Sequence, residues 1–133
     1  MTQEHKELLL KDLSARLPYN VICQVEFKEN GKYNSKVMLL SGIFTDEAYF
    51  TTKGGSIYSN EYKPYLFPLS SMTEEEWEDY QKIRMIDWVH GDINGTFINA
   101  GLIVDWLNAH HFDFRGLIEK SLALDATNLG IYE

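Results

Sequence analysis

The spacing of apolar residues changes near the start of the chain, first following a helical period and then a strand period. Leucines between positions 9 and 17 recur at the interval of an α-helix, Thr2 is a suitable N-cap, and Pro18 stops the pattern. The segment "NVICQVEF" then alternates apolar and polar residues, as a half-buried strand does. We therefore expect a helix from about residue 3 to 16, followed directly by a strand.

Turn residues divide the next stretch into short strands. Asn30-Gly31 favours a tight hairpin turn, because both central residues of such a turn need positive φ, and "KVMLLSGIF" can supply the returning strand. The segments "EAYFTT" and "SIYS" flank Lys53-Gly54-Gly55 and predict a second hairpin. The pattern therefore predicts an antiparallel meander of four short strands, which can close into a small barrel resembling the SH3-like class.

Prolines interrupt the pattern after the meander. Pro64 and Pro68, in "EYKPYLFPLSSM", remove backbone donors and predict a rigid, extended exit from the sheet in place of regular structure. The helix that follows has a clear start, because Thr73 and Glu76 match a capping box.

Helical spacing accounts for most of the remaining chain. The second helix is expected to end at His90-Gly91, since glycine readily takes the left-handed conformation that closes helices. A third helix is expected over about residues 97–110, and a short last helix over about residues 114–123. The residues expected on the buried faces of the second and third helices are Trp77, Tyr80, Ile83, Ile103, Trp106 and Leu107.

The length of the chain fits one domain. A chain of 133 residues can bury a core without disulfides or a structural metal, and the sequence has no internal repeat, low-complexity tract or linker. We therefore expect a single α+β domain over residues 1–133, with an N-terminal helix, a small antiparallel four-stranded meander and C-terminal helices.

Charge and cysteine usage narrow the class of function. The net charge of −8 argues against direct nucleic-acid binding, which relies on clustered Lys and Arg, and it favours a basic partner surface. Cys23 is the only cysteine and the first residues lack the apolar segment of a signal peptide, so the cytoplasm is the expected compartment. No apolar run approaches the roughly 20 residues of a membrane span. The acidic run from Glu74 to Asp79 is expected to be a solvated helix start, with a decoy for a nucleic-acid-binding protein as the alternative.

The segment "DWLNAHHFDFRGLI" gathers histidines and aspartates, yet its spacing disfavours a metal site. Two ligands on one helix should lie three or four residues apart, whereas His110 and His111 are adjacent and would diverge by about 100°. We expect a helix corner here, with Asp113 capping the next helix. Cys23 falls among buried strand positions, where a thiol acts as a small hydrophobe. Neither a catalytic residue nor a metal or other cofactor is expected.

Three pieces of the chain resemble a known family. "KELLLKDLSARLPYNV", "KPYLFPLSSMTEEE" and "DWLNAHHFDFRGLIEKSLALDA" are similar to segments of small, functionally unassigned proteins encoded by gut anaerobic bacteria and their phages. This chain has Ser14 and Ser121 where that family has cysteine and glycine. The resemblance implies a phage or mobile-element accessory gene, and products of such genes often counter host defence.

An aromatic and proline-rich stretch is the best candidate for recognition. Tyr58, Tyr62, Tyr65 and Phe67 offer large contact area at a low cost in side-chain entropy. The alternative is that these rings pack on the sheet and complete the core. We expect Phe67 to be structural and at least one of Tyr62 and Tyr65 to be dispensable for folding.

Cationic residues suggest a second kind of ligand. If part of the surface is a pocket, Lys53, Lys63 and Arg115 are candidate anion partners, and the rings could stack on a base. The leading hypothesis is a non-enzymatic interaction protein that inhibits a host defence or regulatory factor. One alternative is a sponge that sequesters a small anionic nucleotide, as a homo-oligomer because such sites often form between subunits. Another alternative is an enzyme whose groups assemble only in three dimensions.

Overall fold

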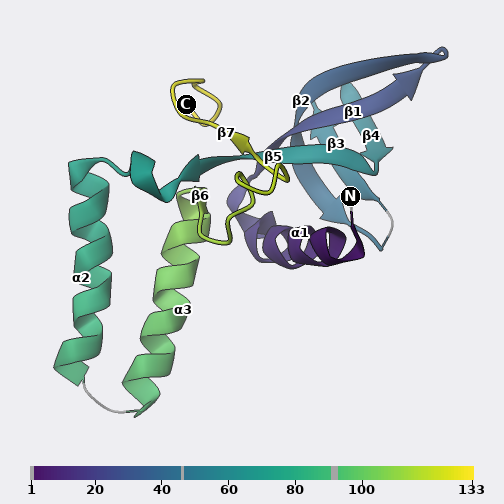
Figure 1. Ribbon diagram of the computed structural model, residues 1–133. Coiled ribbons are helices and arrows are strands. Elements are labelled where there is room, and N and C mark those ends of the chain that lie inside the picture. Colours follow the sequence, from purple (N-terminus) through teal and green to yellow (C-terminus); the bar gives the residue numbers. More distant parts are fainter. Residues whose placement is uncertain (1, 46, 91–92) are drawn as a thin grey trace.

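The protein has an α+β fold, as the sequence predicts (Figure 1). The computed structural model describes residues 2–45, 47–90 and 93–133. In chain order the elements are α1 (Gln3–Arg16), η1 (Leu17–Tyr19), β1 (Ile22–Glu29), β2 (Lys32–Ile43), β3 (Ala48–Thr52), β4 (Gly55–Ser59), β5 (Glu61–Pro68), η2 (Leu69–Ser71), α2 (Glu74–His90), α3 (Ile93–Ala109), β6 (Phe112–Asp113) and β7 (Leu124–Asp125).

Helix α1 begins and ends where the pattern predicts. Thr2 Oγ1 accepts a hydrogen bond of 3.1 Å from the backbone N–H of His5, which caps the first turn. Leu9 and Leu13 are buried in the core, and η1 with Pro18 closes the helix. Helix α1 therefore covers the sheet with its leucine stripe (Figure 1).

Both predicted hairpins are confirmed. Strands β1 and β2 pair from Glu29↔Lys32 onward, and Asn30 and Gly31 between them have φ values of 52° and 80°. Strands β3 and β4 pair from Thr52↔Gly55, with Lys53 in the turn. Residues that share a hairpin are close in sequence, so turn chemistry alone locates these strands.

The prediction that the proline segment lacks regular structure is wrong. Residues Glu61–Pro68 form strand β5, which pairs antiparallel with β1. Pro64 sits opposite Cys23 at the end of this ladder, where one missing N–H disturbs few hydrogen bonds. The segment is therefore part of the sheet and not an exit from it.

The sheet is larger than the predicted four strands and does not close. Its strand order is β4-β3-β2-β1-β5-β6, with β7 also paired to β5, so seven strands form an open sheet. Phe67 N donates to His111 O while Leu66 O accepts from Ala126 N. These groups belong to one peptide unit and point in opposite directions, so β6 and β7 lie on opposite sides of β5. The expected barrel does not form. Closing the four-strand meander would require β4 to pair with β1, but among the described residues β4 pairs with β3, and the second neighbour of β1 is β5.

The predicted last helix is also wrong. Residues 114–123 form successive turns and bends, with positive φ at Gly116 and Ser121. Asp113 accepts backbone hydrogen bonds from Arg115, Leu117 and Ile118, at 3.3, 3.0 and 2.9 Å. The carboxylate caps the segment, as expected of a capping residue, but it holds a compact turn instead of a helix.

Helices α2 and α3 pair with each other and stand to one side of the sheet (Figure 1). The capping box is confirmed, since Glu76 N donates to Thr73 Oγ1 and Thr73 N donates to Glu76 Oε1, at 3.1 and 2.9 Å. Helix α2 ends at His90 as predicted, while Gly91 lies outside the described residues. Helix α3 starts at residue 93, earlier than expected. Trp77, predicted to be buried, is 50% exposed.

The core lies between α1 and the inner face of the strands. The buried hydrophobic cluster comprises Leu9, Leu13, Val21, Cys23, Val25, Met38, Leu40, Ala48, Phe50, Leu66, Leu117, Leu122 and Ala123.

The helices of the described residues include none with the length and apolar character of a membrane-spanning segment.

Candidate functional site

The predicted aromatic segment divides between core and surface. Tyr58 is exposed, Tyr62 is half-buried against Phe50, and Tyr65 is buried. Tyr65 Oη donates to Gln24 Oε1 at 2.6 Å, so the polar end of its side chain is satisfied inside the protein. The structure therefore does not bring the three tyrosines together on one surface.

Phe67 contributes to a group of rings. Its ring lies 6.2 Å from Phe112 and 6.0 Å from Tyr132, measured between centroids. These rings belong to β5, β6 and the C-terminal tail, so Phe67 joins segments that are far apart in sequence. This placement agrees with the structural role expected of it.

The three predicted anion partners lie apart from one another. Lys53 is exposed in the β3–β4 turn, and Lys63 is exposed on β5 opposite Gln24. Arg115 is partly buried, with its guanidinium 4.8 Å from the centre of the Phe114 ring. None of these cationic side chains lines the hollows beside α1 or the hollow between the β1–β2 hairpin and the β3–β4 turn.

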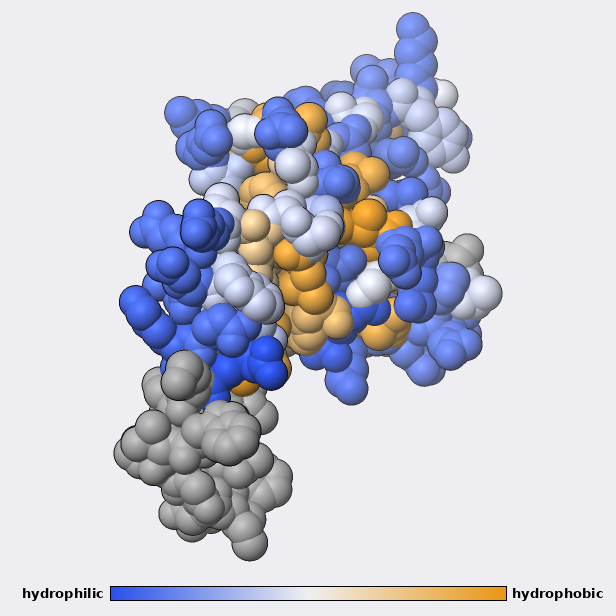
Figure 2. All heavy atoms as spheres, turned by 60° about the vertical axis from the view of Figure 1, so that its left-hand side comes forward, coloured by the Kyte–Doolittle hydropathy of each residue, from blue (hydrophilic) through white to orange (hydrophobic). Residues whose placement is uncertain are grey.

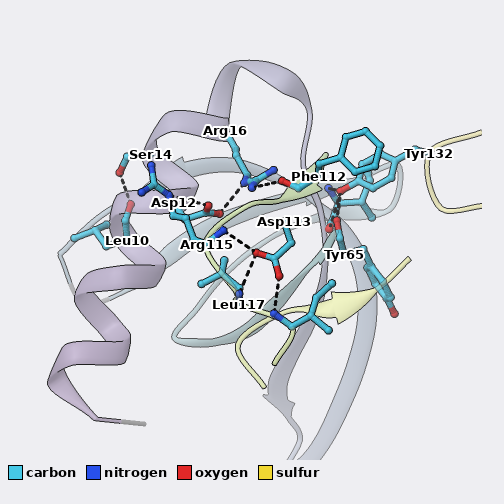
Figure 3. Close-up of polar contacts among 12 residues, drawn as sticks. Leu10, Asp12, Ser14, Arg16, Tyr65, Phe112, Asp113, Arg115, Leu117 and Tyr132 are labelled. Atoms are coloured by element: carbon cyan, nitrogen blue, oxygen red, sulfur yellow. Dashed lines mark hydrogen bonds and ion pairs between the residues drawn. The ribbon is translucent and has the colours of Figure 1, made fainter. Parts of the chain in front are cut away.

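A buried ion cluster accounts for Arg115 (Figure 3). Asp12 and Arg16 are fully buried one turn apart on α1, and Arg16 Nε donates to Asp12 Oδ2 at 2.7 Å. Arg16 Nη2 donates to Phe112 O at 2.6 Å, and Arg115 Nε lies 3.3 Å from Asp12 Oδ1. The cluster ties α1 to the C-terminal segment, and its single carboxylate lies between the two guanidinium groups, so Arg115 has an acidic partner within the chain.

The histidine corner is also tied to the body of the protein. The ring of His111 stacks on Tyr132, with centroids 3.7 Å apart, and His110 meets Trp106 edge-on at 4.2 Å. Burial lowers the pKa of His111 to about 4, and the nearby charges of Arg16 and His110 act in the same direction. His111 is therefore neutral at pH 7.

Cys23 is a buried residue of the core. Burial raises the pKa of the Cys23 thiol, and the side chain has no exposed surface, as strand alternation predicts. Among the side chains described, those of residues 2–45, 47–84 and 101–133, no three from His, Cys, Asp or Glu converge as metal ligands would.

A groove runs along one flank of α1. Two hollows, of about 300 and 600 Å³, share Leu10, Phe44 and Thr45 and so form one continuous groove. We call this the α1 groove. Its helical wall is the stripe formed by Gln3, Glu7, Leu10, Ser14 and Leu17.

The opposite wall of the α1 groove comes from the sheet. The connection from β2 to β3 contributes Phe44, whose N–H donates to Glu47 O at 2.9 Å, and Tyr62 closes one end. Leu10 and Phe44 are 40% and 54% exposed, so large apolar surface remains open to solvent on both walls. Glu7 and Glu47 make the Tyr62 end polar, while Leu17 and Ile43 line the other end.

Phe44 also joins the α1 groove to an aromatic cluster on the outer face of the sheet. Its ring lies 5.8 Å from that of Tyr58, which lies 4.9 Å from Tyr49. The Phe44 ring also lies beside Gly42, where a Cβ would stand 3.6 Å from it, at ordinary van der Waals contact. The predicted contact residue Tyr58 thus belongs to the rim of the groove.

Sequence reasoning missed Leu10 and Phe44 as surface residues. A signal for Leu10 exists, because three consecutive leucines at 8–10 cannot all face one side of a helix. Phe44 lies in a connection and has no comparable signal.

On the face shown in Figure 2, apolar side chains gather in a band between hydrophilic regions. Among the side chains that the structure describes, the exposed large apolar residues are Leu10, Tyr33, Val37, Phe44, Tyr58, Leu69, Trp77, Leu102 and Leu129.

Comparison with protein-family models, with curated proteins and with solved structures finds no match to this chain.

Proposed function

We propose that this protein is a non-enzymatic interaction protein that holds an extended segment of a protein partner in the α1 groove. The observation that carries the proposal is the exposure of Leu10 and Phe44 on the two walls of one continuous groove. Exposed apolar side chains that share a concave surface are typical of interaction sites, whereas scattered ones are not.

The dimensions of the groove favour an extended segment. The stripe from Gln3 to Leu17 rises about 20 Å along the helix at 1.5 Å per residue. An extended chain advances about 3.3 Å per residue, so about six residues would span the groove. A small nucleotide would fill only part of it.

Charge and polarity define the chemistry of that segment. Leu10, Leu17, Ile43 and Phe44 surround the 600 Å³ hollow, which suits an apolar anchor. Glu7 and Glu47 outnumber Lys6 at the other end, which suits a basic side chain. The net charge of −8 favours the approach of such a basic partner from a distance.

The resemblance to proteins of gut anaerobic bacteria and their phages supports a partner of a particular kind. Accessory proteins of such elements often act on a host defence or regulatory factor. We therefore extend the proposal to inhibition of such a factor, by occupation of one of its exposed segments.

Selection from a random peptide display library tests the proposal directly. Immobilised wild-type protein is expected to retain peptides that combine large apolar and basic residues. The retained peptides should bind a Leu10→Ala, Phe44→Ala double variant about 10-fold or more weakly, since interface anchors commonly contribute above 1 kcal/mol each.

A matched variant controls for the loss of apolar surface. Leu69→Ala and Leu129→Ala remove side chains that are exposed to a similar degree but lie away from the groove, so binding should be unchanged. Equal binding by both double variants would contradict the α1 groove as the site. Recovery of nucleotides with the protein, without peptide binding, would favour the sponge instead.

A further inference from the structure

The β1–β2 hairpin presents an unpaired strand edge. Strand β3 pairs with β2 only over Leu39–Ile43, so among the described strands Lys32–Met38 pairs with β1 alone. The hairpin extends beyond the other strands (Figure 1). Exposed strand edges offer backbone donors and acceptors to an incoming strand.

The backbone groups that face outward follow from the hairpin register. In a hairpin with a two-residue turn, the pair flanking the turn, here Glu29↔Lys32, exchanges hydrogen bonds, and such pairs then alternate. Leu40 N donates to Val21 O at 2.9 Å, which fits this alternation. The N–H and C=O groups of Tyr33, Ser35 and Val37 therefore point away from β1. None of these groups has a backbone partner in the described chain.

The side chains along this edge are suited to a partner strand. Tyr33 is 72% exposed and Val37 is half-exposed, so an incoming strand would bury apolar surface on one face. On the other face of the hairpin, a hollow of about 310 Å³ separates Phe27, Lys36 and Met38 from the β3–β4 turn. Apolar surface and free hydrogen-bonding groups thus coincide along this edge.

The charge of the edge indicates the chemistry of the partner. Lys32 and Lys36 lie on one face of the hairpin, and Lys28 lies on the other, 5.7 Å from the Tyr33 ring centre. Glu29 lies opposite Lys32 and Glu26 lies on the Tyr33 face, so the two strands carry three lysines against two glutamates. The edge strand itself carries Lys32 and Lys36 and no acidic residue. A second copy of β2 would bring four lysines onto one face of the new ladder, and like charges there are unfavourable. An acidic strand would meet these lysines with opposite charge.

We propose that the edge of β2 over Lys32–Met38 binds an acidic, extended segment of a protein partner by adding it to the sheet as a strand. Main-chain hydrogen bonds to Tyr33, Ser35 and Val37 would hold the segment, and the lysines would select for carboxylates. This surface is separate from the α1 groove, which suits apolar and basic residues, and neither proposal depends on the other.

Two model peptides test the proposal. Labelled peptides of alternating Glu-Val and alternating Lys-Val are titrated into the wild-type protein, with binding followed by fluorescence anisotropy. The acidic peptide is expected to bind about 10-fold or more tightly than the basic one. Amide exchange measured by NMR should slow at Tyr33, Ser35 and Val37, because these N–H groups become bonded.

Matched variants separate strand pairing from simple charge attraction. Ser35→Pro removes a central outward donor without touching the ladder to β1, while Ser35→Ala keeps that donor and also removes the hydroxyl that accepts from Gln24. The acidic peptide should bind Ser35→Ala like the wild type and Ser35→Pro more weakly. A Lys32→Glu, Lys36→Glu variant should lose binding, whereas Lys11→Glu, Lys82→Glu, with the same net charge, should keep it.

Five results would overturn the proposal, and four of them concern binding of added ligands. The first is that the acidic peptide does not bind. The second is that the two lysine variants bind it equally, and the third is that the two Ser35 variants do so while both remain folded. The fourth is that a single-stranded oligonucleotide binds without protecting the amides of Tyr33, Ser35 and Val37. Self-association that Ser35→Pro abolishes would identify a second copy as the occupant and would also overturn it.

Discussion

At the scale of single residues, Asp12 is the side chain whose removal should cost the most. It is fully buried, accepts a hydrogen bond of 2.7 Å from Arg16 Nε and lies 3.3 Å from Arg115 Nε. Asp12→Ala would leave the buried Arg16 guanidinium uncompensated, and breaking such a pair destabilises by about 3–5 kcal/mol. We expect a loss of this size in the free energy of unfolding, measured by urea denaturation.

Asp105→Ala is the control for this substitution, since Asp105 is exposed on α3 and its removal should change stability by about 0.5 kcal/mol or less. Similar urea midpoints for the two variants would contradict a stabilising role for the buried cluster.

His111 gives a prediction about pH. Its pKa of about 4 lies below the ordinary value of 6.5, so the unfolded chain binds a proton more readily than the folded one. Stability therefore falls as pH drops from about 6.5 towards 4. His111→Asn, which tolerates the φ of 61°, should lack this contribution. The wild type should lose stability relative to this variant over that range, as measured by denaturation at each pH.

The carboxylates common to wild type and His111→Asn cancel in that comparison. An NMR titration gives an independent check, because the imidazole shifts of His111 should change with a midpoint near 4. A midpoint near 6.5, together with parallel pH profiles, would show that the ring is solvated and not buried.

Residues whose environment is set locally could be predicted from the sequence. Strand alternation places Cys23 among buried positions, and it is buried. The roles of Arg115 and Tyr65 could not be predicted in this way, because their partners Asp12 and Gln24 are distant in sequence. A cationic residue in sequence is as consistent with an internal ion pair as with a ligand site.

At the scale of elements, the same distinction separates the confirmed predictions from the wrong ones. Helix α1 and the two hairpins depend on neighbouring residues, so their caps and turns are visible in the sequence. Strand β5 depends on pairing with β1, which compensates for Pro64. The segment 114–123 has the composition of a helix, but the hydrogen bonds of Asp113 and the positive φ of Gly116 hold it as turns.

The capping box of α2 supports a prediction at this scale. Thr73→Ala removes the acceptor for Glu76 N and should lower the free energy of unfolding by about 0.5–2 kcal/mol. Chemical denaturation measures the change, with amide exchange in α2 showing whether the loss is local. Ser70→Ala, at an exposed position just before the helix, is the control. An unchanged midpoint combined with unchanged exchange in α2 would rule out a contribution from this cap.

At the scale of the whole molecule, the α1 groove could not be predicted, because its walls meet only through the tertiary fold. Leu10 comes from the first helix and Phe44 from the connection between β2 and β3. The expected recognition segment supplied only Tyr58 and Tyr62, at the rim and one end. The sequence therefore indicated aromatic contact residues but not the surface to which they belong.

One side chain of the C-terminal tail bridges two neighbouring strands of the sheet, which gives a prediction for the fold as a whole. Tyr132 Oη donates to Tyr65 O at 2.7 Å and accepts from Ile22 N at 3.0 Å, so it bridges β5 and β1 where their ladder ends (Figure 3). Tyr132→Phe keeps the ring that stacks on His111 but leaves both backbone groups without this partner, which should cost about 1–3 kcal/mol. Tyr33→Phe, at an exposed ring, should cost almost nothing.

Two readouts distinguish a weakened fold from a merely loosened tail. Urea denaturation reports the free energy of unfolding, and the rate at which a thiol reagent labels Cys23 reports opening of the sheet, since the buried thiol is protected while β1 stays in place. A bridge that stabilises the whole fold should make Tyr132→Phe both less resistant to urea and faster to label. A lower midpoint with unchanged labelling would confine the effect to the tail, and no change in either would mean that the hydroxyl contributes nothing to stability.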